Sequence, residues 1–107
     1  MPYIKLTANY PSHLIPEVVK AWFAGRKKFP PSDFPGEVPV EVASKASGKG
    51  VETVSMYKAT TENAGAALLW IMKSVVSYQA IVGFEYAIET YSTMEEGLES
   101  VGMKMPE

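Results

Sequence analysis

The run Ala64–Val82, AGAALLWIMKSVVSYQAIV, constrains the fold of this chain more than any other segment. It is apolar on nearly every side, and its one charged residue is Lys73. Segments in which apolar and polar residues alternate, as they do in half-buried strands, lie before and after it. Because a helix that is hydrophobic all round is normally buried, we expect this run to form a helix packed against a sheet.

A membrane-spanning helix is the alternative for such a run, but its length is marginal for crossing a bilayer. Lys73, Ser74, Ser77 and Gln79 interrupt its interior, where polar groups are costly in lipid. The N-terminal residues contain no basic stretch followed by an apolar one, which a signal peptide needs. We therefore expect no membrane partner, no signal peptide and a cytoplasmic protein.

Composition excludes several other classes of protein. The 107 residues suffice for one domain, so residues 1–107 are expected to form a single domain. The chain has no cysteine and one histidine, which excludes a disulfide framework, a thiolate metal site and a multi-histidine site within one chain. A net charge of −2 gives no reason to expect nucleic acid as a partner, because that partner requires a basic face. We expect no metal and no cofactor.

The beginning of the chain predicts a strand followed by a helix. Alternating residues predict the strand over Tyr3–Tyr10. An apolar helical face follows it and ends in a basic cluster, where cations complement the helix dipole. Pro30 and Pro31 prevent continuation of the helix, and the two phenylalanines of the loop Phe29–Gly36 predict that this loop packs down. The face consists of Ile15, Val18, Val19, Trp22 and Phe23, and the cluster of Arg26, Lys27 and Lys28.

A β-hairpin is predicted after this loop. Three alternating valines indicate its first strand, and Pro39, which has no ladder donor, favours a position at the sheet edge. Ser47–Gly50 supplies turn residues before a second strand over Val51–Thr60, with a loop of about four or five residues. This turn precedes a strand rather than a helix, so it is not a phosphate loop. The valines are Val38, Val40 and Val42.

The apolar helix is expected to begin at a cap formed by Thr60 or Thr61 and to end at Gly83. Gln79 lies in the middle of its apolar arc, where a buried amide requires a partner, for which Tyr86 or a backbone carbonyl is available. The residues of the arc expected to cover the sheet are Leu68, Leu69, Ile71, Met72, Val75, Val76 and Val82.

A last strand and a short helix complete the pattern. Residues alternate again over Phe84–Tyr91, which predicts a strand. Thr93–Glu96 matches a capping box, and Gly102 ends the helix that follows. The residues expected to point inward from this helix are Met94, Leu98 and Val101.

This order predicts an α+β domain of the ferredoxin-like type, β-α-β-β-α-β, with a four-stranded antiparallel sheet. Right-handed crossovers place two helices on one face, and the short C-terminal helix follows. The helix-facing set is Ile4, Leu6, Ala8, Val38, Val40, Val42, Phe84, Tyr86 and Ile88. The open face carries Lys5, Thr7, Asn9, Glu41, Ala43, Lys45, Glu85, Ala87, Glu89 and Tyr91. On the third strand, Val51, Tyr57 and Ala59 compete with Val54 and Met56 for the helix side.

With this element order, this length and this terminal helix, the chain resembles the dimeric α+β barrel superfamily over almost all of its residues. The resemblance implies that two copies pair sheet against sheet through the open face and enclose a small cavity. That superfamily includes cofactor-independent monooxygenases, isomerases, haem enzymes and ligand-sensing domains. We therefore expect a homodimeric small-molecule-binding module with a cavity at the sheet face.

The candidate ligand-binding residues are polar side chains of this face: Lys5, Asn9, Glu85 and Tyr91. Glu85 and Glu89 share one face of a strand but lie about 13–14 Å apart along it. That separation is too large for two carboxylates that act on one bond. Lys5, on the neighbouring strand, can lie near either glutamate, and ordinary ion pairing across strands explains the same pattern.

The candidate catalytic bases are His13 and Glu89. His13 follows the first strand near the mouth of the expected cavity, and a histidine titrates near neutrality. An exposed loop histidine accounts for the same position. Related monooxygenases use Asn, Trp and His side chains, for which Asn9, Trp22 and His13 are the residues available, but no motif assigns them these roles.

Two alternative functions remain open. Trp70 and Ile81 lie outside the apolar arc of the helix, which favours a structural or assembly protein that forms a higher oligomer. An enzyme of the cofactor-independent monooxygenase or isomerase type, with His13 or Glu89 as base, is the other alternative.

Overall fold

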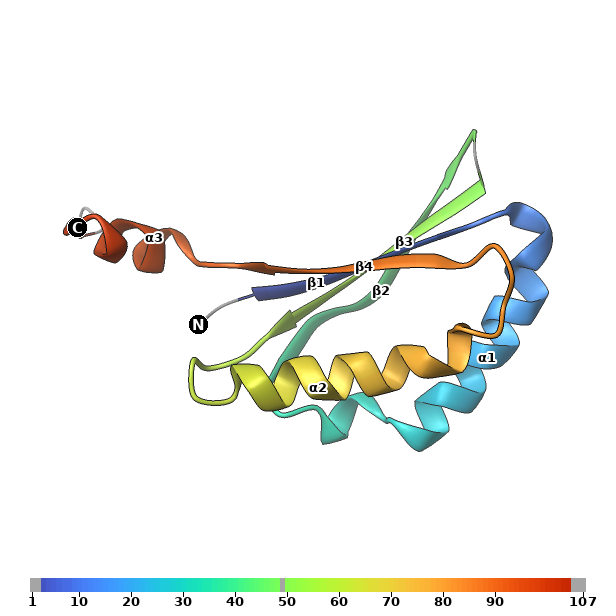
Figure 1. Ribbon diagram of the computed structural model, residues 1–107, viewed down its shortest axis with the longest axis horizontal. Helices are drawn as coiled ribbons and strands as arrows, with labels where there is room; N and C mark the ends of the chain where they lie inside the picture. The colour runs from blue at the N-terminus through green and yellow to red at the C-terminus, as the bar shows by residue number, and fades with distance from the viewer. Residues whose placement is uncertain (1–2, 49, 105–107) are drawn as a thin grey trace.

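The chain folds in the element order that its sequence predicts, as the computed structural model of residues 3–48 and 50–104 shows (Figure 1). Short 3₁₀ turns at Ser12–Leu14, Pro31–Asp33 and Val76–Tyr78 connect the longer elements. The strands and helices are β1 (Tyr3–Tyr10), α1 (Ile15–Lys28), β2 (Glu37–Ser47), β3 (Gly50–Lys58), α2 (Ala64–Val75), β4 (Glu85–Tyr91) and α3 (Met94–Ser100).

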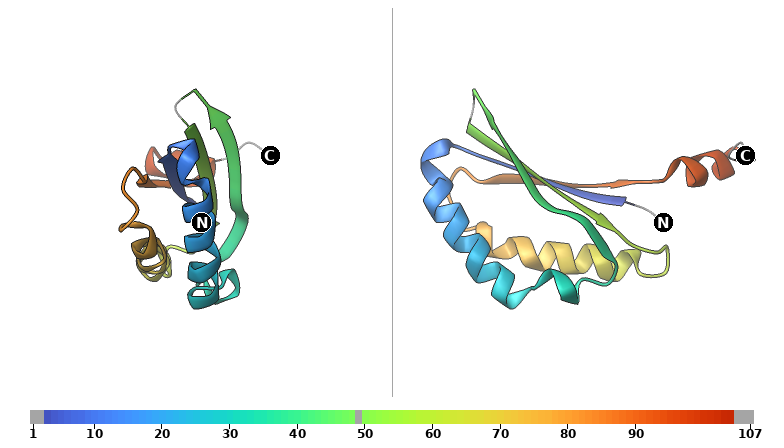
Figure 2. Two further views of the ribbon diagram at one scale, coloured as in Figure 1. Left: turned by 90° about the vertical axis from the view of Figure 1, so that its right-hand side faces the viewer. Right: turned by 180° about the vertical axis from the view of Figure 1, so that it is seen from behind.

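The four strands form one antiparallel sheet in the order β2-β3-β1-β4. Helices α1 and α2 both lie on one side of this sheet (Figures 1 and 2). The fold is therefore α+β and ferredoxin-like, as predicted. Strand β2, which contains Pro39, lies at an edge of the sheet, where a missing ladder donor is tolerated.

The register between β1 and β3 settles which residues of β3 face the helices. Tyr57 lies opposite Ile4 and Thr53 lies opposite Ala8, and the side chains of Ile4, Ala8 and Tyr57 are buried. Residues directly opposite each other in a sheet share a face. The helix side therefore includes Val51, Tyr57 and Ala59, and the open face includes Val54, Met56 and Lys58.

Strand β2 departs from the predicted alternation. Its register against β3 shifts between Glu37 and Val40 and again between Val40 and Ala43. Each such bulge adds a residue to one strand and reverses the alternation of its faces. Val40 consequently lies opposite Met56 on the open face, and the Glu41 carboxylate reaches helix α1. The predicted faces of Val40 and Glu41 were both wrong.

Two clusters of buried side chains hold the helices on the sheet. The first brings Phe34, from the loop after α1, onto Ile4 of β1 and Ile71 of α2. This confirms the prediction that the proline-rich loop packs down. Each large apolar side chain buried here stabilises the fold by about 1.5–3 kcal/mol relative to full exposure. The second cluster joins Tyr10, Leu14, Val18 and Ile81.

Helix α2 ends at Val75, well before the predicted end at Val82. The Ser74 hydroxyl donates to the Ile71 carbonyl at 2.7 Å, and the Ser77 hydroxyl donates to the Ser74 carbonyl at 3.3 Å. Hydrogen bonds of this kind compete with the helix ladder, and the chain continues as a 3₁₀ turn. Among the described residues, no helix combines the length and the hydropathy that crossing a bilayer requires.

The start of α2 also differs from the prediction. Its N-cap is Asn63 rather than Thr60 or Thr61. The Thr60 hydroxyl accepts a hydrogen bond from the Asn63 N–H at 3.1 Å, so this threonine organises the turn before the helix instead of capping it.

The buried face of α2 is rotated from the predicted arc. Trp70 packs edge-on against Phe34, with ring centroids 5.2 Å apart, and Ile81 is buried in the second cluster. Aromatic pairs add to the gain from burial, which explains why Phe29 and Phe34 draw Trp70 inward. The argument for a higher oligomer from Trp70 and Ile81 therefore loses its basis. Arc residues that are exposed instead are Leu69, Met72, Val76 and Val82.

Candidate functional site

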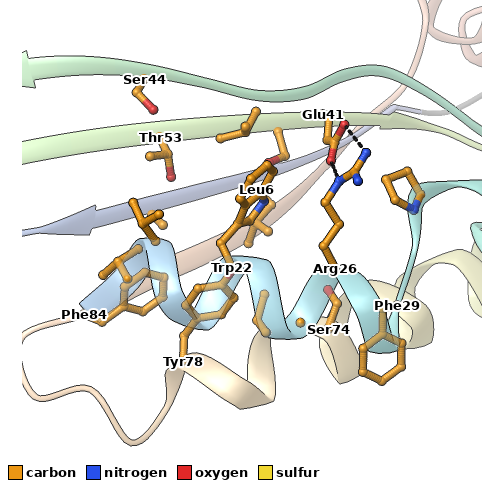
Figure 3. A pocket seen from close by; sticks show the side chains of 18 of the residues that line it. Leu6, Trp22, Arg26, Phe29, Glu41, Ser44, Thr53, Ser74, Tyr78 and Phe84 are labelled. Carbon is orange, nitrogen blue, oxygen red and sulfur yellow. Dashed lines mark hydrogen bonds and ion pairs between the residues drawn. The ribbon is translucent and has the colours of Figure 1, made fainter. Parts of the chain in front are cut away.

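A pocket of about 230 Å³ lies between α1 and the sheet (Figure 3). Helix α1 leaves this room because Val18 is the residue that it buries, whereas Ile15, Val19 and Phe23 of the predicted apolar face stay exposed. Strands β1, β2 and β3 supply the floor with Leu6, Ala8, Val42, Ser44, Thr53 and Ser55. The walls come from α1, the end of α2 and the segment before β4, with Val18, Trp22, Ser74, Val75, Tyr78 and Phe84.

Aromatic rings form one wall of the pocket. Figure 3 shows Trp22, Tyr78 and Phe84 on the same side of it. The rings of Tyr78 and Phe84 are stacked, with centroids 4.9 Å apart and planes 13° apart. Tyr10 stacks on Phe84 with a centroid distance of 5.9 Å. Such flat, rigid surfaces favour contact with a flat apolar ligand.

Hydroxyl groups lie across the floor from this wall. Ser44 and Thr53 bring theirs from β2 and β3 (Figure 3), and Ser55 of β3 is buried. Hydroxyls donate and accept hydrogen bonds, so a few of them in an apolar pocket can fix the orientation of a ligand that carries an oxygen. Burial of the Tyr57 ring raises the pKa of its phenol.

Burial keeps the tyrosines around the pocket neutral. Desolvation raises the pKa of Tyr78 to about 12, and it also raises the pKa of Tyr10. A buried phenolate is costly because it loses its hydration. The phenols of this site therefore act as protonated donors and acceptors rather than as bases.

Stability is expected to fall at alkaline pH because of Tyr78. A tyrosine in the unfolded chain ionises near pH 10, whereas Tyr78 in the fold keeps its proton to about pH 12. Between these values the unfolded state binds fewer protons, so the free energy of unfolding falls as pH rises. Below this window the contribution of Tyr78 is fully present. Urea unfolding at stepped pH values measures the loss, which Tyr78→Phe is expected to reduce.

Tyr86→Phe is the matched control for this prediction, because the Tyr86 side chain is 40% exposed and lies outside the pocket. An equal reduction of the alkaline loss in both variants would contradict the assignment to Tyr78.

An ion pair between α1 and β2 lies at the pocket. Arg26 Nε donates to Glu41 Oε1 at 2.5 Å and Nη2 donates to Oε2 at 3.4 Å (Figure 3). The hydrogen bond and the charge of Glu41 raise the pKa of Arg26. The guanidinium carbon also lies 5.8 Å from the centre of the Trp22 ring. Both side chains are partly exposed, so they form a polar rim whose charges cancel.

Sequence reasoning did not single out these residues. Arg26 was explained by the end of its helix, and Glu41 was placed on the open face because the bulges of β2 carry no sequence signal. Tyr78 and Phe84 could have been recognised from the sequence as candidates for a buried aromatic cluster, since large rings beside a turn need apolar surroundings.

The predicted ligand-binding residues lie on the opposite face of the sheet from the pocket. Lys5 is directly opposite Glu89, and Asn9 is directly opposite Glu85. The Tyr91 hydroxyl donates to the Glu89 carboxylate at 3.2 Å. The structure therefore gathers Lys5, Glu89 and Tyr91 at one end of this face and places Asn9 with Glu85 near the other. Their role in ligand binding stays a prediction.

The remaining singled-out residues are also outside the pocket. His13 is exposed in the 3₁₀ turn before α1 and does not line the pocket. Gln79 donates to the Tyr86 hydroxyl at 3.3 Å, which confirms the predicted partner, but the pair is exposed rather than buried. Within residues 3–48 and 50–104, no three His, Cys, Asp or Glu side chains are placed to hold a metal ion.

Comparison with solved structures finds the same fold in other proteins. A putative monooxygenase from Shewanella loihica PV-4 has a TM-score of 0.52 and 13% identity, with 87% of this chain and 94% of that chain covered. The de novo designed protein Foldit4 has a TM-score of 0.51 and 14% identity, with 86% of this chain and 96% of that chain covered. No protein-family model matches this chain, and no curated protein is similar to it in sequence. Because a designed chain shares the fold, the fold alone carries no function.

Proposed function

We propose that this chain is a small-molecule-binding module whose ligand is a small, neutral molecule of up to three flat aromatic rings. The pocket between α1 and the sheet carries this proposal, with its aromatic wall, its hydroxyl floor and its charge-balanced rim. Sites for drug-sized ligands occupy about 300–1,000 Å³. A volume of about 230 Å³ therefore suits a smaller ligand.

The lining of this pocket favours binding over catalysis. Among the described residues that line it, the charged ones are Arg26 and Glu41, and each engages the other. The candidate bases His13 and Glu89 are not among the lining residues. A cofactor-independent monooxygenase or isomerase is supported by the fold of the Shewanella protein alone, which at 13% identity is a likeness of fold.

We place the chain, as part of the same proposal, in the dimeric α+β barrel superfamily, with two copies paired through the open sheet face. The element order and the similarity in fold to the Shewanella protein support this placement. On this face Val54 and Met56 are half-buried apolar residues beside Lys5 and Thr7, which suits a mixed, partly polar interface. A cytoplasmic location stays a prediction.

The test is binding of the neutral fluorophore N-phenylnaphthylamine to the 107-residue chain. We expect a rise in its fluorescence that saturates with a Kd in the micromolar range, as befits a small apolar ligand. Val42→Trp should weaken binding about tenfold or more, because this side chain lines the pocket and is 42% exposed, so the fold tolerates a larger ring. Val82→Trp, 91% exposed and outside the pocket, is the control.

Equal binding by both tryptophan variants would place the fluorophore elsewhere and overturn the proposal.

A second experiment compares the binding of a neutral and a negatively charged probe. The sulfonated analogue, anilinonaphthalene sulfonate, should bind more weakly than the neutral probe, because Glu41 already neutralises Arg26. Glu41→Gln frees the guanidinium and should strengthen binding of the sulfonate by about three- to fivefold, with no gain for the neutral probe.

A further inference from the structure

Helix α3 is closed at both ends by its own sequence. The Thr93 hydroxyl accepts from the Glu96 N–H at 3.1 Å, and the Glu96 carboxylate accepts from the Thr93 N–H at 2.8 Å. This confirms the predicted capping box. After the last turn Gly102 has a φ of +76°, and the Met103 N–H donates to the Leu98 carbonyl at 2.8 Å. That pattern is a Schellman motif, which closes the C-terminal end.

A single copy offers this helix little to pack on. Helix α3 lies beyond the end of the sheet, away from α1 and α2 (Figures 1 and 2). Met94 and Val101 are each 69% exposed, although both were predicted to point inward. A helix of seven residues is too short to be stable without tertiary contacts. Residues 3–48 and 50–104 of its own copy leave the apolar side chains Met94 and Val101 exposed, so the capped helix needs a further apolar surface.

The overall shape points the same way. The radius of gyration is 15.7 Å, whereas a compact domain of this length has about 13 Å. The accessible surface of 7211 Å² exceeds the value of about 5,900 Å² for a compact monomer of 11.7 kDa. The excess of about 1,300 Å² is more than the roughly 800 Å² that each partner buries in a standard interface.

A groove of about 640 Å³ between α2 and β4 offers such a surface, and we call it the α2–β4 groove. Met72 and Val76 of its lining are 50% and 56% exposed, because the rotation of α2 turned them outward. Strand β4 is also an edge strand, so its outer backbone groups are unpaired within the sheet. The described residues that line this groove and those that line the ligand pocket are different residues. The apolar lining is Leu68, Met72, Val76, Tyr86 and Ile88.

We propose that α3 of each copy docks in the α2–β4 groove of a second copy of this chain. Met94, Leu98 and Val101 recur at helical spacing and form the apolar stripe that the groove receives. Charge favours the same occupant, because α3 carries three glutamates and no cation, while the charged residue that lines the groove is Lys73. We call α3 the arm of each copy. Reciprocal exchange of two arms fills both grooves of the same two copies that the proposed function pairs through the open sheet face, on which this step rests, and it closes the assembly at two copies.

The first test is sedimentation equilibrium of the 107-residue chain. The wild type should be a dimer, and Met94→Asp/Val101→Asp should raise its Kd about tenfold or more, because two carboxylates would enter an apolar groove. Val82→Asp, outside the groove, should leave the Kd within about twofold. A monomeric wild type, or a dimer whose Kd Met94→Asp/Val101→Asp leaves unchanged, would overturn the proposal.

A charge exchange distinguishes docking of α3 from loss of its structure. Glu99→Lys places a cation in the last turn of α3, where the helix dipole favours it, so the helix itself is kept. Glu99→Lys and Lys73→Glu should each weaken the dimer about threefold, and the two changes in one chain should restore it. Lys20→Glu, on α1, is the control partner and should restore nothing. Failure of restoration by Lys73→Glu refutes the docking.

The ligand pocket and this contact are tested separately. Arm variants that lose the dimer but still bind N-phenylnaphthylamine leave the proposed function standing. The converse result is a wild type that binds no probe while the α3 variants still weaken its dimer. That result contradicts the proposed function and leaves the docking of α3 standing. A dimer whose Kd is unchanged in the arm variants but that Met56→Asp breaks assigns the contact to the open sheet face alone and overturns the exchange.

Discussion

Replacing Ile71 by alanine is expected to lower the free energy of unfolding by about 3–4 kcal/mol. The side chain is 0% exposed and belongs to the cluster that joins α2, β1, β3 and the loop after α1. The loss combines the transfer free energy of the deleted atoms with the cavity that they leave. Because a domain of this size has only about 5–15 kcal/mol in total, the change removes a large share of its stability.

Leu69→Ala in the same helix is the matched control. Leu69 is 52% exposed, so its truncation should cost less than about 1 kcal/mol. Urea unfolding followed by circular dichroism measures both variants, and equal m-values establish that both losses refer to the same transition. The amphipathic projection of the sequence assigned both residues to the buried arc. Equal losses for Ile71→Ala and Leu69→Ala would therefore favour that arc over the observed rotation of α2.

The predictable part of this fold depends on local signals. Alternation over Tyr3–Tyr10 predicts a strand with one buried face, and the same signal over Phe84–Tyr91 predicts β4, in which Ile88 is half-buried against the first cluster. Thr93 and Glu96 define the start of α3 because a capping box is made within one turn. Pro39 predicts an edge strand because proline has no backbone N–H to donate to a neighbouring strand. Each of these signals is a property of a few neighbouring residues, and each was confirmed.

The predictions were wrong where contacts between residues far apart in the sequence determine the structure. The extent of α2 was misjudged because Val76–Val82 is as apolar as the helix before it, while burial of Ile81 against Tyr10 and Leu14 requires the chain to turn. The rotation of α2 depends on Phe34, which comes from a loop far away in the sequence. Periodicity within one segment does not contain that information.

The candidate site depends on contacts between distant residues even more than the fold does, so the sequence predicted it less well. Polar residues on the open face, such as Lys5 and Glu89, are conspicuous in the sequence because they interrupt an apolar pattern. The pocket instead arises from apolar residues that α1 fails to bury, and from bulges in β2 that turn Glu41 toward Arg26. A cavity is a mismatch between surfaces of several elements, so it has no pattern of its own along the chain.

Gly50→Ala is expected to destabilise the fold by about 3 kcal/mol. Gly50 opens β3 with a φ of +129°, which a residue with a side chain rarely adopts. A Cβ atom at this position would lie 2.3 Å from the Tyr10 carbonyl oxygen and 3.0 Å from the Pro11 Cα. Both neighbours are backbone atoms, so the end of β1 has to move rather than a flexible side chain. Thermal and urea unfolding measure the loss.

Gly48→Ala tests whether the cost comes from this close approach or from the hairpin in general. Gly48 lies in the same turn, but among the described residues no atom outside its two chain neighbours lies within 4 Å of the position that its Cβ would take. Its substitution should change stability by less than about 0.5 kcal/mol. The displacement in Gly50→Ala also moves Tyr10, whose ring stacks on Phe84 in the pocket wall. Weaker N-phenylnaphthylamine binding is thus expected for Gly50→Ala, and equal stability of the two variants would contradict the close approach.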